Sequence, residues 1–118
     1  MEYRNKSGIL HRDDGPALVR KNGTKFWYQN GYIHRLNGPA IEYADGSREW
    51  YVHGLLHRTD DFAVMHASGY REWWVEGELH RTDGPAIIHA NGKQEWYWHG
   101  NPITEFEHWI LANATEPA

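Results

Sequence analysis

A 23-residue repeat constrains this chain more than any other feature of its sequence. The dipeptide His-Arg occurs four times at this spacing, beginning at His11, His34, His57 and His80. Each copy continues with a Gly 12 residues after the His, a Trp four residues later and a second Gly four residues after that. A fixed period of this length is typical of repeat architectures, in which each unit buries its apolar face only against its neighbours.

The first Gly of each unit predicts the tip of a β-hairpin. In the first unit, residues 17–20 lead to Asn22-Gly23 and residues 25–28 lead away from it. The other tips are expected at residues 45–46, 68–69 and 91–92. Asn-Gly and Asp-Gly favour a positive φ at both turn positions, which is type I′ geometry.

Counting from two-residue turns fixes the expected register of these hairpins. Ile41 then lies opposite Trp50 on one face, and Ala40 lies opposite Tyr51 on the other. Because a Trp recurs at the same place in every unit, we expect the Trp column to form the core.

The second Gly of each unit predicts a second turn. If this turn also contains two residues, Trp50 lies opposite His57 and Glu49 lies opposite Arg58. The same count in the next unit pairs Glu72 with Arg81. Opposite charges across neighbouring strands contribute ~0.2–1 kcal/mol each. Cross-strand Glu–Arg ion pairs are therefore expected.

The segments that join the hairpins carry Gly-Pro in three of the four units. We call these segments links; they span residues 13–16, 36–39, 59–62 and 82–85. Pro belongs at the start of a strand because it cannot donate to a ladder, and Asp or Asn before Gly favours a turn. The third link has Asp61-Phe62 instead of Gly-Pro, which is the most informative irregularity in the repeat.

The two ends of the chain depart from the repeat. Residues 1–10 resemble the back half of a unit and are expected to cap the exposed N-terminal edge. Near the other end, Thr104 and Glu107 form a capping-box pattern that predicts a helix of about residues 105–112. We expect this helix to lay Phe106, Trp109 and Ile110 over the last hairpin.

These patterns predict a single all-β domain over residues 1–118, built as an antiparallel meander or solenoid. Its expected parts are a half-repeat at 1–10, hairpin repeats at 11–33, 34–56, 57–79 and 80–102, a capping helix at 104–113, and a frayed tail at 114–118.

Composition excludes several classes of protein. The 118 residues include no Cys, which rules out disulfides and thiolate chemistry and fits a reducing cytosol. No apolar stretch approaches a membrane span or a secretion signal. A net charge of −4 argues against non-specific binding to nucleic acid. We therefore expect a soluble, cytoplasmic protein that does not act on membranes.

The motif His-Arg-x-Asp-Gly-Pro-Ala, followed by Glu-Trp-Tyr-x-x-Gly, resembles a repeat family of bacteriophage and giant-virus proteins. More distantly, the 23-residue spacing is similar to membrane occupation and recognition nexus (MORN) repeats. The resemblance covers about residues 8–103. It implies a hairpin-repeat fold and a scaffold or adaptor role. The viral resemblance also implies that the partner is a host protein, which could belong to a defence system in the host cytoplasm.

The nine His residues raise the possibility of a metal site, which the spacing argues against. Equivalent His residues lie at least two strands apart, or ~10 Å. A zinc ion needs ligands at ~2.0–2.1 Å, so one His column cannot share an ion. We expect structural histidines whose ring nitrogens bond to the backbone of the links, with no metal and no other cofactor. No nucleophile, phosphate-loop or metalloprotease motif is present, so we expect no enzyme activity.

The leading functional hypothesis is a protein-binding module. Exposed aromatic residues rimmed by charge commonly anchor protein interfaces. The third and fourth units hold such residues where the other units differ. The candidate binding residues are Asp61, Phe62, Met65, Tyr70, Trp74, Glu76 and Trp98. Irregular packing against the terminal helix is the alternative explanation for this aromatic bulk.

Two other functions remain open. The repeated Arg could bind the phosphates of a small nucleotide while aromatic rings stack on its base. In that case the ligand-binding residues are Arg12, Arg35, Arg58 and Arg81. The chain could also be a structural component of a virus particle.

Overall fold

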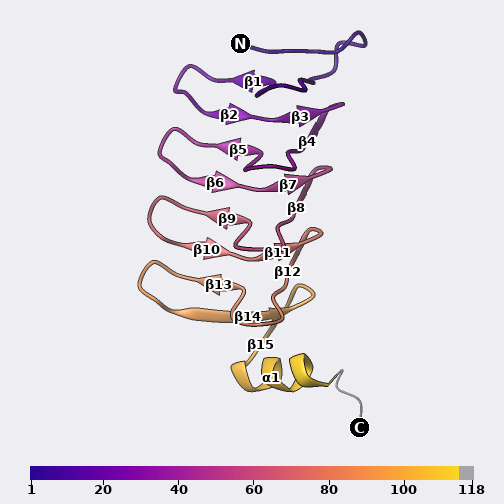
Figure 1. The fold of residues 1–118 in the computed structure, drawn as a ribbon. Helices are drawn as coiled ribbons and strands as arrows, with labels where there is room; N and C mark the ends of the chain where they lie inside the picture. The colour runs from indigo at the N-terminus through magenta and orange to yellow at the C-terminus, as the bar shows by residue number, and fades with distance from the viewer. Residues whose placement is uncertain (115–118) are drawn as a thin grey trace.

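Short antiparallel hairpins follow one another along an elongated molecule, described here by a computed structural model of residues 1–114 (Figure 1). Its principal extents are 55 × 33 × 20 Å. The predicted all-β meander with a C-terminal helix is confirmed.

One ladder runs the length of the molecule and contains the first hairpin of every unit. Within residues 1–114 it holds nine strands in the order β1-β2-β5-β6-β9-β10-β13-β14-β15. Their bounds are Leu18–Val19, Lys25–Phe26, Ile41–Glu42, Arg48–Glu49, Val64–Met65, Arg71–Glu72, Ile87–Ile88, Gln94–Trp98 and Asn101–Ile103.

A second column of hairpins stands beside this ladder (Figure 1). It consists of three two-stranded sheets, β3-β4, β7-β8 and β11-β12, and the pairing of β14 with β15 continues it at the C-terminal end. The bounds of the six strands are Tyr28–Gln29, Tyr32–Ile33, Tyr51–Val52, Leu55–Leu56, Trp74–Val75 and Glu78–Leu79.

The first turns lie where the sequence predicts, but their predicted register is wrong by one residue. The second-unit turn is a three-residue loop, closed by a hydrogen bond from the Tyr43 N–H to the Ser47 carbonyl at 2.9 Å. Within it, positive φ is confined to Gly46, because the Asp45 side chain accepts the Ser47 N–H at 2.8 Å and forms a local turn. Ile41 consequently lies opposite Glu49 and not Trp50. Counting two residues in this loop also misplaced Ala40.

The type I′ geometry occurs at the second turns instead. His53 and Gly54 have φ values of 49° and 81°, and the same pair of positive values recurs at the three equivalent turns. The two-residue count is therefore correct here. The His57 N–H donates to the Trp50 carbonyl at 3.1 Å, which confirms the expected pairing.

The expected cross-strand ion pairs do not form. After His57 the chain leaves its hairpin, and the Arg58 N–H donates to the Trp74 carbonyl of β11 at 3.0 Å. The Arg58 side chain turns into its own link and binds Asp60, while Glu49 accepts hydrogen bonds from tyrosine hydroxyls. Arg81 likewise binds Asp83 and not Glu72.

The N-terminal segment pairs with the edge of the ladder. Glu2 forms a bridge with Leu18, and the Tyr3 N–H donates to the Ala17 carbonyl at 2.7 Å. The edge of β1 is thereby covered by chain that carries no regular strand.

Helix α1, Glu105–Asn113, covers the other end of the ladder against β14. Its capping box is present as predicted, with both hydrogen bonds between Thr104 and Glu107. The face predicted to pack inward is wrong, however, because His108 is buried and Phe106, Trp109 and Ile110 are exposed. Of the expected frayed tail, residues 115–118 lie outside the described part of the chain.

The core is thin and consists, apart from Phe62, of alanine and aliphatic side chains. The Ala of each link end is fully buried, and the following aliphatic residues are buried beside it in three units; the residues are Ala17, Ala40, Ala63, Ala86, Ile41, Val64 and Ile87. The repeated Trp side chains are only half-buried, contrary to the expected Trp core. The outer faces of three of these rings are covered by the arginines that directly precede the links.

Candidate interaction surfaces

An arginine–aromatic ladder covers the half-buried rings. The guanidinium carbon of each Arg lies over a ring of the preceding unit: Arg35 over Trp27 at 3.9 Å, Arg58 over Trp50 at 3.9 Å, and Arg81 over Trp73 at 4.4 Å. Arg12 lies over Tyr3 in the same way at 4.0 Å. A cation over an aromatic face is attracted by the ring quadrupole. Each link is therefore fastened to the hairpin before it.

The same arginines fold the links. Nη1 of each Arg donates to the carbonyl four residues later at 3.1–3.3 Å, so the link curls around the guanidinium. A Cβ on Gly38 would lie 2.9 Å from Cζ of Arg35. Gly at this place lets the guanidinium approach the backbone without displacement of the Arg side chain. In the third link Asp61 occupies the equivalent place, and its carboxylate accepts the Phe62 N–H at 2.8 Å.

Three of the four arginines also bind an Asp of the adjoining link. Nε of Arg12, Arg58 and Arg81 donates to the Asp two residues later at 2.9, 3.0 and 2.9 Å. Beside Arg12, this contact lowers the pKa of Asp14. The second link has Asn37 at this place, and its arginine instead pairs through Nη1 with Glu42 at 3.1 Å.

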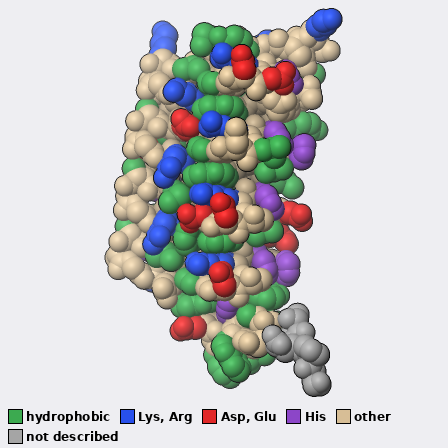
Figure 2. Space-filling model, viewed as in Figure 1, with side chains coloured by type: hydrophobic (Ala, Val, Ile, Leu, Met, Phe, Trp, Pro, Cys, Tyr) green, Lys and Arg blue, Asp and Glu red, His purple; other side chains and the backbone are tan. Residues whose placement is uncertain are grey.

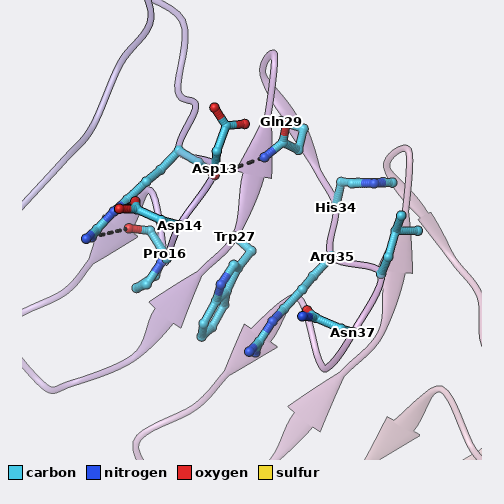
Figure 3. A pocket seen from close by; sticks show the side chains of 11 residues that line it. Asp13, Asp14, Pro16, Trp27, Gln29, His34, Arg35 and Asn37 are labelled. Atoms are coloured by element: carbon cyan, nitrogen blue, oxygen red, sulfur yellow. Dashed lines mark hydrogen bonds and ion pairs between the residues drawn. The ribbon is translucent and has the colours of Figure 1, made fainter.

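Grooves separate successive links. The one between the first and second links has a volume of about 720 Å³, and the next has about 560 Å³. Figure 3 shows Arg35 lying along Trp27 in the first groove, with Asn37 beside it. The four arginines proposed for a nucleotide ligand thus lie in one column, but each already pairs with a carboxylate: three with an Asp of the adjoining link and Arg35 with Glu42.

The repeated His forms a second column, whose role is structural. Nδ1 of His11, His34, His57 and His80 accepts the N–H of the left-handed residue in the second turn of its own unit at 2.9–3.0 Å. The expectation that these ring nitrogens bond to the backbone of the links is therefore wrong for Nδ1, which bonds to the second turns. This bond requires an unprotonated Nδ1. Figure 2 shows the His side chains along one side of the face that bears the Lys and Arg columns.

Neighbouring imidazoles strengthen the preference for the neutral form. The His80 ring is stacked on His99 with 4.0 Å between centroids, and His34 lies 4.4 Å from His53. Burial, followed by repulsion from the neighbouring ring, lowers the pKa of His34 and of His80. Within residues 1–114, no three His, Asp or Glu side chains are placed to hold a metal ion.

A carboxylate on the return strand of each later hairpin accepts hydrogen bonds from aromatic side chains. Glu49 accepts from the hydroxyls of Tyr43 and Tyr51 at 3.1 and 2.9 Å. Glu72 accepts from the Tyr70 hydroxyl and from Nε1 of Trp74. Burial, with the charge of Glu49 adding to it, raises the pKa of Tyr43 to about 12. These carboxylates are structural acceptors.

The candidate residues of the third unit do not form one patch. Phe62 has an exposed fraction of 5 % and packs edge-on against Trp73, so it cannot anchor a partner. Tyr70 and Trp74 meet at Glu72. Met65 lies opposite Arg71 in the ladder, whereas Glu72 lies opposite Val64, so Met65 points to the other face.

The other three candidates lie apart from that group. Asp61 is half-buried next to Arg58, and Glu76 is exposed at a second turn where its N–H binds His57. Trp98 is half-buried and contacts the rings of His80 and His108. Trp98 therefore packs against the terminal helix, as the alternative explanation predicted.

The largest exposed aromatic side chains lie on α1. Phe106 and Trp109 have exposed fractions of 68 % and 62 %, and their rings are nearly parallel with 6.4 Å between centroids. Ile110 extends the patch, and Glu105 and Glu107 are exposed beside it. We call these five residues the α1 face. Sequence reasoning named its apolar members and assigned them to the wrong side of the helix.

The inward side of α1 is decided by His108. Its Nε2 is within hydrogen-bond distance of the Arg81 carbonyl, and its ring meets Trp98 edge-on with 5.7 Å between centroids.

In the described part of the chain, no helix has the length and apolar character needed to cross a bilayer. Comparisons with protein-family models, curated proteins and solved structures find no match to this chain.

Proposed function

We propose that this protein is a non-catalytic binding module that engages another protein through the α1 face. The observation that carries the proposal is that Phe106 and Trp109 point outward from a helix whose other side packs against the ladder. Large aromatic side chains clustered on a surface are typical of binding anchors.

The packing of α1 supports a rigid presentation of this face. The capping box fixes the start of the helix, and His108 fixes its rotation against β14 and the Arg81 carbonyl. A partner would meet side chains held on a fixed element, so little conformational entropy is lost on binding. Fully burying two such rings removes ~150–250 Å² each from water, worth several kcal/mol at ~25 cal/mol per Å².

The charge of the α1 face indicates the kind of partner. Glu105 and Glu107 flank the aromatic pair, and the last turn of the helix carries no basic residue. A complementary partner surface is an apolar groove with Lys or Arg at its rim. The resemblance to viral repeat proteins makes host proteins the first class in which to look for this partner.

Site-specific photo-crosslinking tests this proposal. A benzophenone amino acid is placed at Phe106 in one protein and at Tyr32, which has a similar exposed fraction of 60 %, in another. In lysate of the cells in which the protein acts, we expect a discrete crosslinked protein from position 106 and none from position 32. In the protein with benzophenone at position 106, Trp109→Ala with Ile110→Ala should abolish recovery of that crosslinked protein without unfolding the chain. Equal crosslinking from both positions would contradict the proposal.

The nucleotide alternative has less support from the geometry. A phosphate at Arg12, Arg58 or Arg81 would have to displace an Asp that is already bonded to Nε. A thermal-shift series with nucleotides is the direct test, because a ligand that binds only the folded state raises the unfolding temperature.

A further inference from the structure

We propose that the second link binds a carboxylate group of a partner protein through Arg35. The inference is separate from the α1 face and comes from comparing the four links. Arg12, Arg58 and Arg81 each use Nε to hold an Asp carboxylate from the same link. The second link, residues 36–39, is the one link whose sequence contains no acidic residue.

Arg35 therefore keeps two donor groups open. Its hydrogen bonds within residues 1–114 both come from Nη1, to the Pro39 carbonyl and to Glu42, each at 3.1 Å. Nε and Nη2 make none. These two donors form the edge of the guanidinium that accepts a carboxylate through two parallel hydrogen bonds. Asn37 replaces the carboxylate that occupies this place in the other links with a neutral amide.

The open edge is held in a fixed position. The guanidinium lies 3.9 Å over the Trp27 ring, and the two Nη1 hydrogen bonds set its rotation. An incoming carboxylate would therefore meet donors that need no reorganisation, which preserves affinity. The side chain of Arg35 is 24 % exposed.

The surroundings suit a protein carboxylate. The link lies between the grooves of about 720 and 560 Å³, which give room for an approaching chain. Leu36, beside Arg35, has an exposed fraction of 80 %, whereas the equivalent residues are Asp13, Thr59 and Thr82. An Asp or Glu next to an apolar side chain would satisfy both features of the link.

Electrostatics favours a singly charged group over phosphate. Glu42 already neutralises part of the Arg35 charge. Asp14 and Asp60 of the neighbouring links stand at the repeat spacing of ~10 Å, about one Debye length at 0.1 M salt. They repel a dianion more than a monoanion. In the other three links, the group bound to Nε of the Arg is also a carboxylate.

Nuclear magnetic resonance of the arginine side chains tests the proposal directly. The probe is N-acetyl-aspartate N-methylamide, with the uncharged asparagine analogue as control. The Nε–Hε resonance of Arg35 should shift saturably with the aspartate probe, and those of Arg12, Arg58 and Arg81 should shift several-fold less. The asparagine analogue should shift none of them. Equal shifts at all four arginines, or no saturation at Arg35, would overturn the proposal.

Two matched variants separate binding from folding. Asn37→Asp supplies the carboxylate found in the other links and should weaken probe binding at least about tenfold. Asn37→Ser removes the amide without adding charge and should retain binding. If Asn37→Asp binds the probe as well as the natural chain does, the site is not the open edge of Arg35. Stronger binding of inorganic phosphate than of the aspartate probe would overturn the assignment to a carboxylate.

Discussion

The second and third links depart from the repeat in opposite ways. The third has lost Gly-Pro, yet Arg58 still lies over a Trp ring, donates to the carbonyl four residues later and binds the Asp two residues later. The second has kept Gly-Pro, yet Arg35 has lost the Asp. The comparison shows that a link is defined by a backbone that curls around the guanidinium of the preceding Arg. Gly-Pro is one sequence that allows this backbone conformation. The ion pair between the Arg and the Asp is separate and can be absent while the link keeps its conformation.

The largest effect is expected when the ring beneath an Arg is removed. Trp50→Ala takes away the platform of Arg58 and the ring that lines the groove between the second and third links. We expect a loss of about 3 kcal/mol in the free energy of unfolding, at the low end for Trp because the ring is half-buried. Urea denaturation followed by circular dichroism measures it. A loss below about 1 kcal/mol would show that the ladder contributes little to stability.

Restoring the repeat in the third link should also destabilise the protein. Phe62→Pro introduces the residue found in the other links, but Phe62 is buried against Trp73 with Arg71 and Arg81 over its ring. We expect a loss of about 2 kcal/mol from the missing aromatic packing. Asp61→Gly is the matched control and should change stability by less than about 1 kcal/mol. A Phe62→Pro protein as stable as the natural chain would mean that the ring is dispensable.

Adding a methyl group to the second link tests the close approach of its Arg. Gly38→Ala places a Cβ 2.9 Å from Cζ of Arg35, so the end of this side chain must move aside and its contacts with the Trp27 ring and the Pro39 carbonyl are weakened. We expect a loss of about 1 kcal/mol in the free energy of unfolding. In an Arg35→Ala background the same substitution should be nearly neutral, and an undiminished loss there would locate the conflict elsewhere.

The sequence allowed the hairpins, their tips and the terminal helix to be predicted, because Gly spacing and a capping box are local signals. The register failed because the Asp45 side chain binds the backbone and admits a third loop residue. The side of α1 that faces inward failed because a polar residue, His108, takes the buried place through a contact with Arg81. Neither contact is visible as an apolar pattern.

The candidate sites show the same limit. The loss of Gly-Pro in the third link was visible, and it suggested an exposed Phe62 that the fold in fact buries. The change to Asn37 was equally visible in the sequence. Its meaning depends on knowing that Nε of the preceding Arg holds the Asp in the other links, which only the folded arrangement shows.

A smaller effect is expected from pH, through the His column of the second and fourth units. The pKa values of His34 and His80 are lowered in the folded state, so the unfolded chain takes up protons first as pH falls. Stability should therefore be complete above about pH 6.5 and decline below it through the folded pKa values. Urea midpoints at pH 7.5 and 5.0 measure the decline. His34→Asn keeps an acceptor near the place of Nδ1 without titrating in this range, and an unchanged pH dependence in that variant would exclude His34 as a source.

The smallest effect is expected when the second link is given the attachment that the third retains. Asn37→Asp supplies Arg35 with a carboxylate two residues away, the geometry that Arg58 shows with Asp60 at 3.0 Å. An exposed pair of this kind contributes ~0.2–1 kcal/mol, and repulsion from Glu42 across the guanidinium reduces it. We therefore expect a gain of about 0.5 kcal/mol at low salt that disappears in 1 M NaCl. The converse change, Asp60→Asn, should lose a similar amount in the third link. If Asn37→Asp instead destabilises the protein at both salt concentrations, the absence of an acid in the second link is required by Glu42 for folding, and the open edge of Arg35 needs no binding role to explain it.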